Sequence, residues 1–224
     1  MGNKGLVQNR ILKDYIILCE GIDEVNFLIT YLNSDELKYN ERFSNDIQVF
    51  NFGGINMLSS YLKNFVKLDG FNKVKRLMII RDAEKNYDSA ISNIRSALDN
   101  NGFEAPKDVS IWSGENIKTG YLLFPECSSI KSNGTLEDMC LRIINEERFE
   151  RIDKEIDIFL DGLEDKEYRL LNHRFKSKLH TYFSVTDNYI GSKVGEAAKR
   201  GAFNWNSDYL VGLRSFIEEG FEGL

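Results

Sequence analysis

Short apolar runs alternate with segments of helical periodicity through the first two-thirds of this chain of 224 residues. The apolar runs, each followed by a glycine, a proline or a polar residue, are residues 15–19, 47–52, 74–80, 109–112 and 120–124. Apolar side chains recur at helical spacing in residues 24–32, 55–68, 87–98 and 135–144. This alternation predicts an α/β fold, in which a parallel sheet carries helices on both faces.

The pattern changes near residue 145, after which no further apolar run of strand length occurs. The remaining residues are charged, amphipathic and typical of helices. We therefore expect an α/β domain over residues 1–145 and a helical C-terminal extension over residues 146–224 that packs on it. Thr135 and Asp138 fit the pattern of a capping box, which would begin the last helix of the first domain.

The composition favours a cytoplasmic protein. No apolar run approaches the ~20 residues that a membrane-spanning helix needs, and the amino terminus shows no apolar signal-peptide core. The three cysteines, Cys19, Cys127 and Cys140, are odd in number, far apart and surrounded by apolar residues. They therefore indicate packed thiols in a reducing compartment rather than disulfides or a zinc cluster.

Acidic residues follow two of the apolar runs. Glu20 follows YIILC, and Asp82 and Glu84 come directly after LMIIR. Because ligands bind at the carboxyl ends of the strands in an open parallel sheet, neighbouring strands would bring these acids into one crevice. Carboxylates that lie close together repel each other unless a cation separates them, and Mg²⁺ and Mn²⁺ prefer hard oxygen ligands. The sequence therefore predicts a site for one of these ions, although each acid alone fits a helix cap or a solvated loop equally well.

The order of these motifs resembles the Toprim domain, which topoisomerases, bacterial primases and small maturation ribonucleases share. The features are a strand followed by Glu20-Gly21, a second strand followed by Gly53-Gly54, and an acid pair, Asp82 and Glu84, after a third. More closely, CEGIDEVNFL, RDAE, YLLFPE and GTLEDMCL resemble a small Toprim-related family of stand-alone prokaryotic proteins. The overcoming-lysogenization-defect nucleases form the nuclease branch of the same group.

This resemblance implies roles for particular residues. Glu20 would be a metal ligand or a general acid/base, and Asp82 and Glu84 would hold Mg²⁺ or Mn²⁺. A second metal would be bound by further acids, as in the nuclease branch: Glu24, with Asp23 beside it, and Glu137, with Asp138 beside it. A downstream lysine would assist catalysis: we assign this role to Lys178, with Lys176 and Lys118 as substitutes.

The function that the resemblance implies is metal-dependent cleavage of phosphodiester bonds in DNA or RNA, within a phage-defence or DNA-processing system. One departure is that Glu84 stands where Toprim enzymes usually carry aspartate. The alternative is a non-catalytic Toprim-like module that acts with a partner protein such as an ATPase, and the net charge of −6 also favours it. Hydrolysis of a small phosphorylated compound would use the same acids.

A basic segment lies within the acidic chain. Residues 168–200 contain seven Lys or Arg and two Asp or Glu, so their net charge is 7 − 2 = +5. Such a segment can hold a phosphate backbone, and Tyr182, Phe183 and Tyr189 within it would stack on bases if they are exposed. The alternatives are a solvated helix face for the charges and core packing for the aromatic residues.

Overall fold

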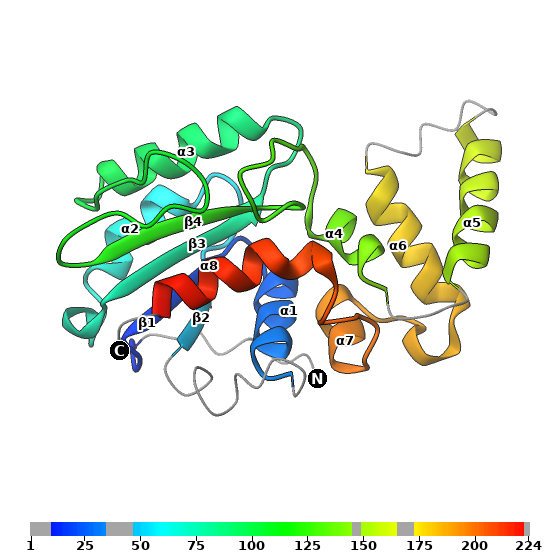
Figure 1. The fold of residues 1–224 in the computed structure, drawn as a ribbon, viewed down its shortest axis with the longest axis horizontal. Helices are drawn as coiled ribbons and strands as arrows, with labels where there is room; N and C mark the ends of the chain where they lie inside the picture. The colour runs from blue at the N-terminus through cyan, green and yellow to red at the C-terminus, as the bar shows by residue number, and fades with distance from the viewer. Residues whose placement is uncertain (1–9, 35–46, 145–148, 165–172, 222–224) are drawn as a thin grey trace.

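A four-stranded parallel sheet forms the centre of the protein (Figure 1). The structure is a computed structural model, and it describes residues 10–34, 47–144, 149–164 and 173–221. The strand order is β2-β1-β3-β4, with bounds β1 Tyr15–Cys19, β2 Ile47–Asn51, β3 Arg76–Asp82 and β4 Lys118–Phe124. Cys19 pairs with both Asn51 and Ile80, and Asp82 pairs with Phe124. The carboxyl ends of all four strands therefore meet at one edge.

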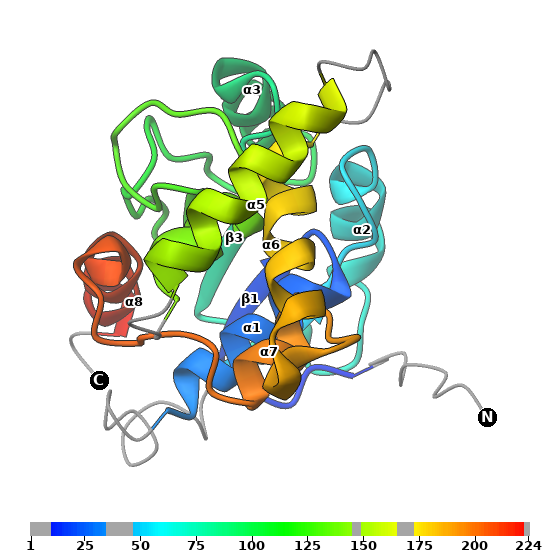
Figure 2. The same ribbon diagram turned by 90° about the vertical axis from the view of Figure 1, so that its right-hand side faces the viewer.

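Helices cover both faces of this sheet, as an α/β fold requires (Figures 1 and 2). One face carries α2, Leu58–Phe65, and α3, Tyr87–Asp99. The ring of Phe65 lies 5.8 Å from that of Phe50 in β2. The opposite face carries α1, Ile22–Leu32, and α8, Val211–Phe221. There Phe27 packs edge-on against Phe124 at 6.5 Å.

The C-terminal part of the described chain is helical, as the sequence predicts. After α4, Leu136–Arg142, which the sequence pattern places in the first domain, come α5 Phe149–Glu164, α6 Arg174–Val185 and α7 Val194–Lys199, with 3-10 turns at Asp187–Tyr189 and Asp208–Leu210. Helices α5 and α6 lie side by side to one side of the sheet (Figures 1 and 2). Helix α7 packs closely on α1 at Gly195, where an added Cβ would lie only 2.3 Å from Cβ of Asn26.

Residues 109–112 form a loop, so the strand predicted there is wrong. Ser110 has a φ of 60°, a left-handed conformation that interrupts an extended chain. Ser113 then pairs antiparallel with Thr119 in an isolated bridge at the start of β4. The apolar side chains of this run serve packing instead. Val109 is buried, and the Trp112 ring stacks on Phe216 of α8 at 4.7 Å.

The core includes the three cysteine side chains, Cys19, Cys127 and Cys140, which are buried and free, as predicted. Burial raises the pKa of each thiol above its ordinary value, so these cysteines are packed as neutral groups. Within the described ranges, no helix has both the length and the apolar character to cross a membrane.

Candidate functional site

Asp82 is a buried carboxylate at the carboxyl edge of the sheet. It ends β3 with 8% of its surface exposed, and its Oδ1 accepts a hydrogen bond of 2.8 Å from the backbone N–H of Leu136, the first residue of α4. Burial raises the pKa of Asp82 well above its ordinary value, and repulsion from Glu24, Glu137 and Glu20 adds to this rise. These four acids therefore share one electrostatic environment.

Glu24 reaches the site because α1 begins immediately after β1. Gly21 is the N-cap of α1, and a Cβ at this position would lie 2.6 Å from Oε2 of Glu24. The Glu24 side chain thus folds back over Gly21, and any larger residue at position 21 would displace it. Burial raises the pKa of Glu24, and repulsion from Glu137 and Asp23 contributes. Asp23 lies in the first turn of α1, but its side chain does not cap the helix.

Glu137 enters the site from the first turn of α4 and is paired with a lysine. It is 7% exposed, and Oε1 lies 2.8 Å from Nζ of Lys176 in α6. Burial alone would raise the pKa of Glu137, but the hydrogen bond and charge of Lys176 outweigh it and hold this pKa below its ordinary value. Glu137 is therefore ionised at neutral pH and compensated by one cation.

Glu20 lies beside a buried arginine that the sequence argument did not consider. Nε of Arg81, a residue only 1% exposed, lies 3.4 Å from Oε2 of Glu20 and donates to the carbonyl of Asp82. Among the residues that the structure describes, none donates a hydrogen bond to Oε2 of Glu20 or accepts one from Nη1 of Arg81. Burial raises the pKa of Glu20 to about 7, Arg81 opposes this rise, and Glu24 and Glu84 add to it. A charged residue inside the apolar run LMIIRD was the signal that could have identified Arg81.

Glu84 and Asp138 have local structural roles. The backbone of Glu84, at a φ of 57°, exchanges two hydrogen bonds with Gly134, which ties the end of β3 to the loop before α4. The carboxylate of Asp138 accepts hydrogen bonds from N and Oγ1 of Thr135. This confirms the capping box predicted at Thr135 and Asp138. The carboxylate of Asp138 is thus already engaged within α4.

Among the three candidate lysines, the structure places Lys176 against the acids. Nζ of Lys178 lies 2.7 Å from both Asp153 and Asp157 of α5, so this ammonium joins two helices. Lys118 begins β4, at the opposite edge of the sheet from the acids. The three aromatic side chains expected to stack on bases if exposed, Tyr182, Phe183 and Tyr189, are all buried. The core-packing alternative is therefore correct for them.

The acids do not form a preassembled cage. In the described parts of the chain, no group of three or more His, Cys, Asp or Glu side chains is arranged to hold a metal ion. Beside the acids lies a pocket of about 390 Å³, whose lining includes groups from the loops after β3 and β4 and from α6. Its lining residues are Glu84, Lys85, Asn133, Gly134, Thr135, Asp138, His173, Arg174, Phe175 and Lys176.

Comparisons with known proteins identify a family and a similar structure. A family model described as "Protein of unknown function (DUF3226)" matches residues 14–222. Among solved structures, the chain is similar to a hypothetical protein from Pyrococcus horikoshii OT3, with 15% sequence identity and a TM-score of 0.45. That similarity covers 93% of this chain and 94% of the other. No curated protein matches the chain.

Proposed function

The chain belongs to the DUF3226 family of proteins of unknown function, and from its acidic site we propose an activity: divalent-cation-dependent cleavage of phosphodiester bonds in nucleic acid. The observation that carries the proposal is the shared, largely buried environment of Asp82, Glu24, Glu137 and Glu20. A folded protein places several carboxylates together at an energetic cost, and such sites are often functional. Bound divalent cations remove most of that cost.

The donor set fits Mg²⁺ or Mn²⁺. Carboxylate oxygens are the hard ligands that these ions prefer, and burial with mutual repulsion raises the pKa values of Asp82 and Glu24, a cost that a bound cation would remove. Asp82 and Glu24 would hold the first ion, and Glu137 a second. When bound, these ions supply a Lewis acid for the phosphoryl oxygens and lower the pKa of water.

The protein's own groups supply the remaining chemistry. Glu20, whose pKa is about 7, is suited to accept and return a proton near neutral pH. Lys176 is 56% exposed at the pocket, and its ammonium offsets negative charge on a bound phosphate. Arg81 lies under Glu20 and balances part of the buried negative charge. In this scheme Lys176 takes the catalytic role that the sequence assigns to Lys178.

The arrangement of motifs supports the Toprim resemblance as part of the proposal. Glu20-Gly21 follows β1, Gly53-Gly54 follows β2, and Asp82 and Glu84 end or follow β3. The backbone N–H groups of Gly53 and Gly54 both donate to the carbonyl of Glu20. This contact holds the loop after β2 next to the first acid.

Incubation with nucleic acids tests the proposal. Purified protein with Mn²⁺ or Mg²⁺ is expected to cleave DNA or RNA, and Asp82→Asn and Glu24→Gln are expected to lower the rate on the order of 100-fold. Asp69→Asn is the matched control, because Asp69 is an exposed acid that pairs with Arg10. No cleavage by wild-type protein, or equal rates for Asp82→Asn and Asp69→Asn, would contradict the proposal.

A second candidate is a non-catalytic module that binds a partner protein, such as an ATPase. The ion pairs Lys176–Glu137 and Arg81–Glu20 favour it, since they compensate two of the acids without any metal ion. Calorimetric titration with Mn²⁺ separates the candidates. Binding heat that disappears in Asp82→Asn supports the enzyme, whereas absence of binding at millimolar Mn²⁺ supports the module.

A further inference from the structure

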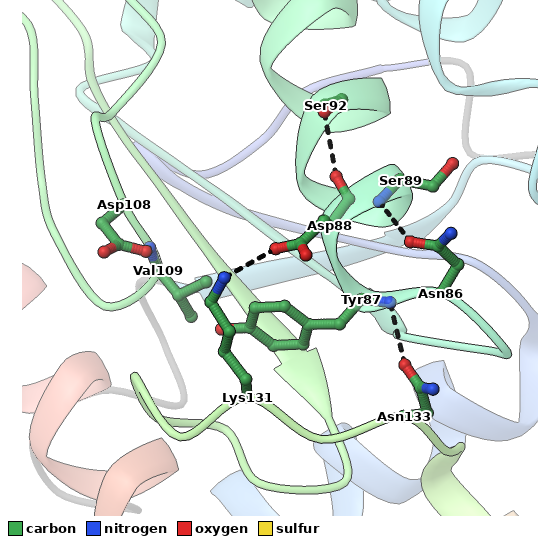
Figure 3. A network of polar contacts seen from close by, with 9 residues as sticks. All are labelled: Asn86, Tyr87, Asp88, Ser89, Ser92, Asp108, Val109, Lys131 and Asn133. Carbon is green, nitrogen blue, oxygen red and sulfur yellow. Dashed lines mark hydrogen bonds and ion pairs between the residues drawn. The ribbon is translucent and has the colours of Figure 1, made fainter.

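A groove leads away from the acids over the first turn of α3. The pocket of about 390 Å³ beside Glu84 continues into a second one of about 350 Å³, and the two share Lys85 and Asn133. The second pocket is lined by residues 85–88 and 131–133, most of which appear in Figure 3. We call these two pockets together the α3 groove.

Donor groups line this groove. The amide oxygen of Asn133 accepts from the backbone N–H of Tyr87 at 2.9 Å, and that of Asn86 accepts from Ser89 at 2.9 Å (Figure 3). Because both oxygens serve α3, the NH₂ groups are the part of each amide left to donate to a ligand. These two N–H groups in the first turn of α3 therefore donate to side chains of the protein rather than to a bound anion.

Two lysines add positive charge to the groove. Lys85 is exposed, and no ion pair of Lys85 occurs within the described ranges. Lys131 pairs with Asp88 at 2.9 Å, but both side chains are largely exposed, so this pair is weak and easily exchanged for another anion. Four cations, Lys85, Lys131, Arg174 and Lys176, line the two pockets together with three acids, Glu84, Asp88 and Asp138. The groove thus presents cations and amide donors that suit a chain of phosphates.

An exposed aromatic ring lines the larger of the two pockets. Phe175 is 53% exposed, lines the larger pocket and lies between Arg174 and Lys176 in α6. Aromatic side chains flanked by cations are the usual platform for unpaired bases. The buried rings of the same helix, Tyr182 and Phe183, cannot serve this purpose.

We propose that the α3 groove binds a single strand of nucleic acid, with Lys85 and Lys131 against its phosphates and Phe175 against an unpaired base. This inference rests on the proposed function, because it names the form in which the substrate reaches the acids. A single strand fits better than a duplex, since paired bases hide their faces within the stack. A polymer fits better than a small phosphorylated compound, since the groove extends past the acids into a second pocket.

Binding of a fluorescein-labelled oligothymidylate, followed by fluorescence anisotropy in EDTA, tests the inference without any cleavage. Phe175→Ala is expected to weaken binding roughly tenfold. Lys85→Ala is expected to weaken it for all sequences and to reduce the slope of log K against log salt by about one. The matched controls are Phe159→Ala, an equally exposed ring on α5, and Lys73→Ala, an exposed lysine before β3.

Three outcomes would overturn the inference: no binding by wild-type protein, equal affinities of the two variants and their controls, or equal affinity for the matched duplex. The fate of the proposed function is read separately. If binding depends on Phe175 but the protein never cleaves nucleic acid, the proposed nuclease activity is wrong and the proposed binding site stands. If Phe175→Ala and Lys85→Ala cleave with unchanged KM and kcat, the proposed nuclease activity stands and the proposed binding site is wrong.

Discussion

Arg81 and Asp82 are adjacent in sequence, yet their side chains leave opposite faces of β3. Arg81 balances Glu20, whereas Asp82 lies among Glu24, Glu137 and the first N–H of α4. The site therefore has one compensated side and one side with excess negative charge. The acids on the second side are the stronger candidates for cation ligands, and Glu20 is the stronger candidate for proton transfer.

The raised pKa of Glu20 predicts a pH dependence of stability in cation-free buffer. Glu20 has a pKa of about 7 in the folded protein against an ordinary value of 4.5, because burial disfavours its charged form. Its neutral form stabilises the fold below about pH 4.5, and this contribution is lost as the pH rises through 7. Glu20→Gln is expected to reduce the fall in the free energy of unfolding over this pH range by roughly 1–2 kcal/mol. This is less than the full pKa shift of Glu20 implies, because solvent still reaches the carboxylate.

Urea unfolding of both proteins across this pH range measures the effect. Some decline remains in Glu20→Gln, since the pKa values of Glu24 and Asp82 are also raised. Glu115→Gln, at an exposed acid in another loop, provides the control and should keep the wild-type slope. Identical slopes for wild type and Glu20→Gln would show that Glu20 titrates normally.

Helix α6 joins the acidic site to helix α5 through two lysines with different partners. Lys176 contacts Glu137, and Lys178 contacts Asp153 and Asp157. Residues two apart on a helix are about 200° apart around its axis, so only one of the two lysines can face the acids. The basic composition of the segment could be recognised in the sequence, but which of the two faces packs on α5 is decided by tertiary contacts.

Substitution of these lysines separates a structural role from a functional one. Lys178→Met is expected to lower the free energy of unfolding by about 1 kcal/mol, because Asp153 and Asp157 lose their shared cation, and to leave the cleavage rate of the folded protein unchanged. Lys176→Met is expected to lower the cleavage rate by about tenfold or more. Denaturant unfolding and cleavage assays on both variants check this. Loss of activity in Lys178→Met with unchanged stability would instead favour the original assignment.

Local signals explain which elements the sequence could predict. β1 and β3 are apolar runs that end in acids, and Thr135 with Asp138 is a short-range capping pattern, so each was recognisable without the fold. The predicted strand at 109–112 was wrong because apolar composition does not distinguish a buried loop from a strand. Lys85, Asn133 and Phe175 were missed because the pocket brings them together only after the chain has folded.

At the scale of the whole molecule, α8 returns to cover β4 and closes the second face of the sheet. A Cβ on Gly120 would lie 2.5 Å from the Phe216 ring and 3.0 Å from that of Trp112. A Cβ on Gly220 would lie 2.4 Å from Trp112. Two glycines on opposite partners thus make room for one stacked pair of rings, which holds the last helix against the sheet.

Gly120→Ala is expected to destabilise the protein by roughly 1–3 kcal/mol, because the added methyl group overpacks this contact. Phe216→Ala should cost less in the Gly120→Ala background than in wild type, since the two positions are coupled. Gly162→Ala, at a helical position with open space around it, is the control and should be neutral or stabilising. Thermal unfolding of the four variants measures these effects, and additive losses at positions 120 and 216 would disprove the coupling.

The ion pair between Glu137 and Lys176 also has a consequence for biosynthesis. During translation, Glu20, Glu24 and Asp82 leave the ribosome long before α6 is made. The nascent chain therefore carries these acids for much of its synthesis before the ammonium group of Lys176, which later balances their neighbour Glu137, is added. We expect the carboxyl edge of the sheet to be the last part of the protein to settle, after the ribosome has released α6.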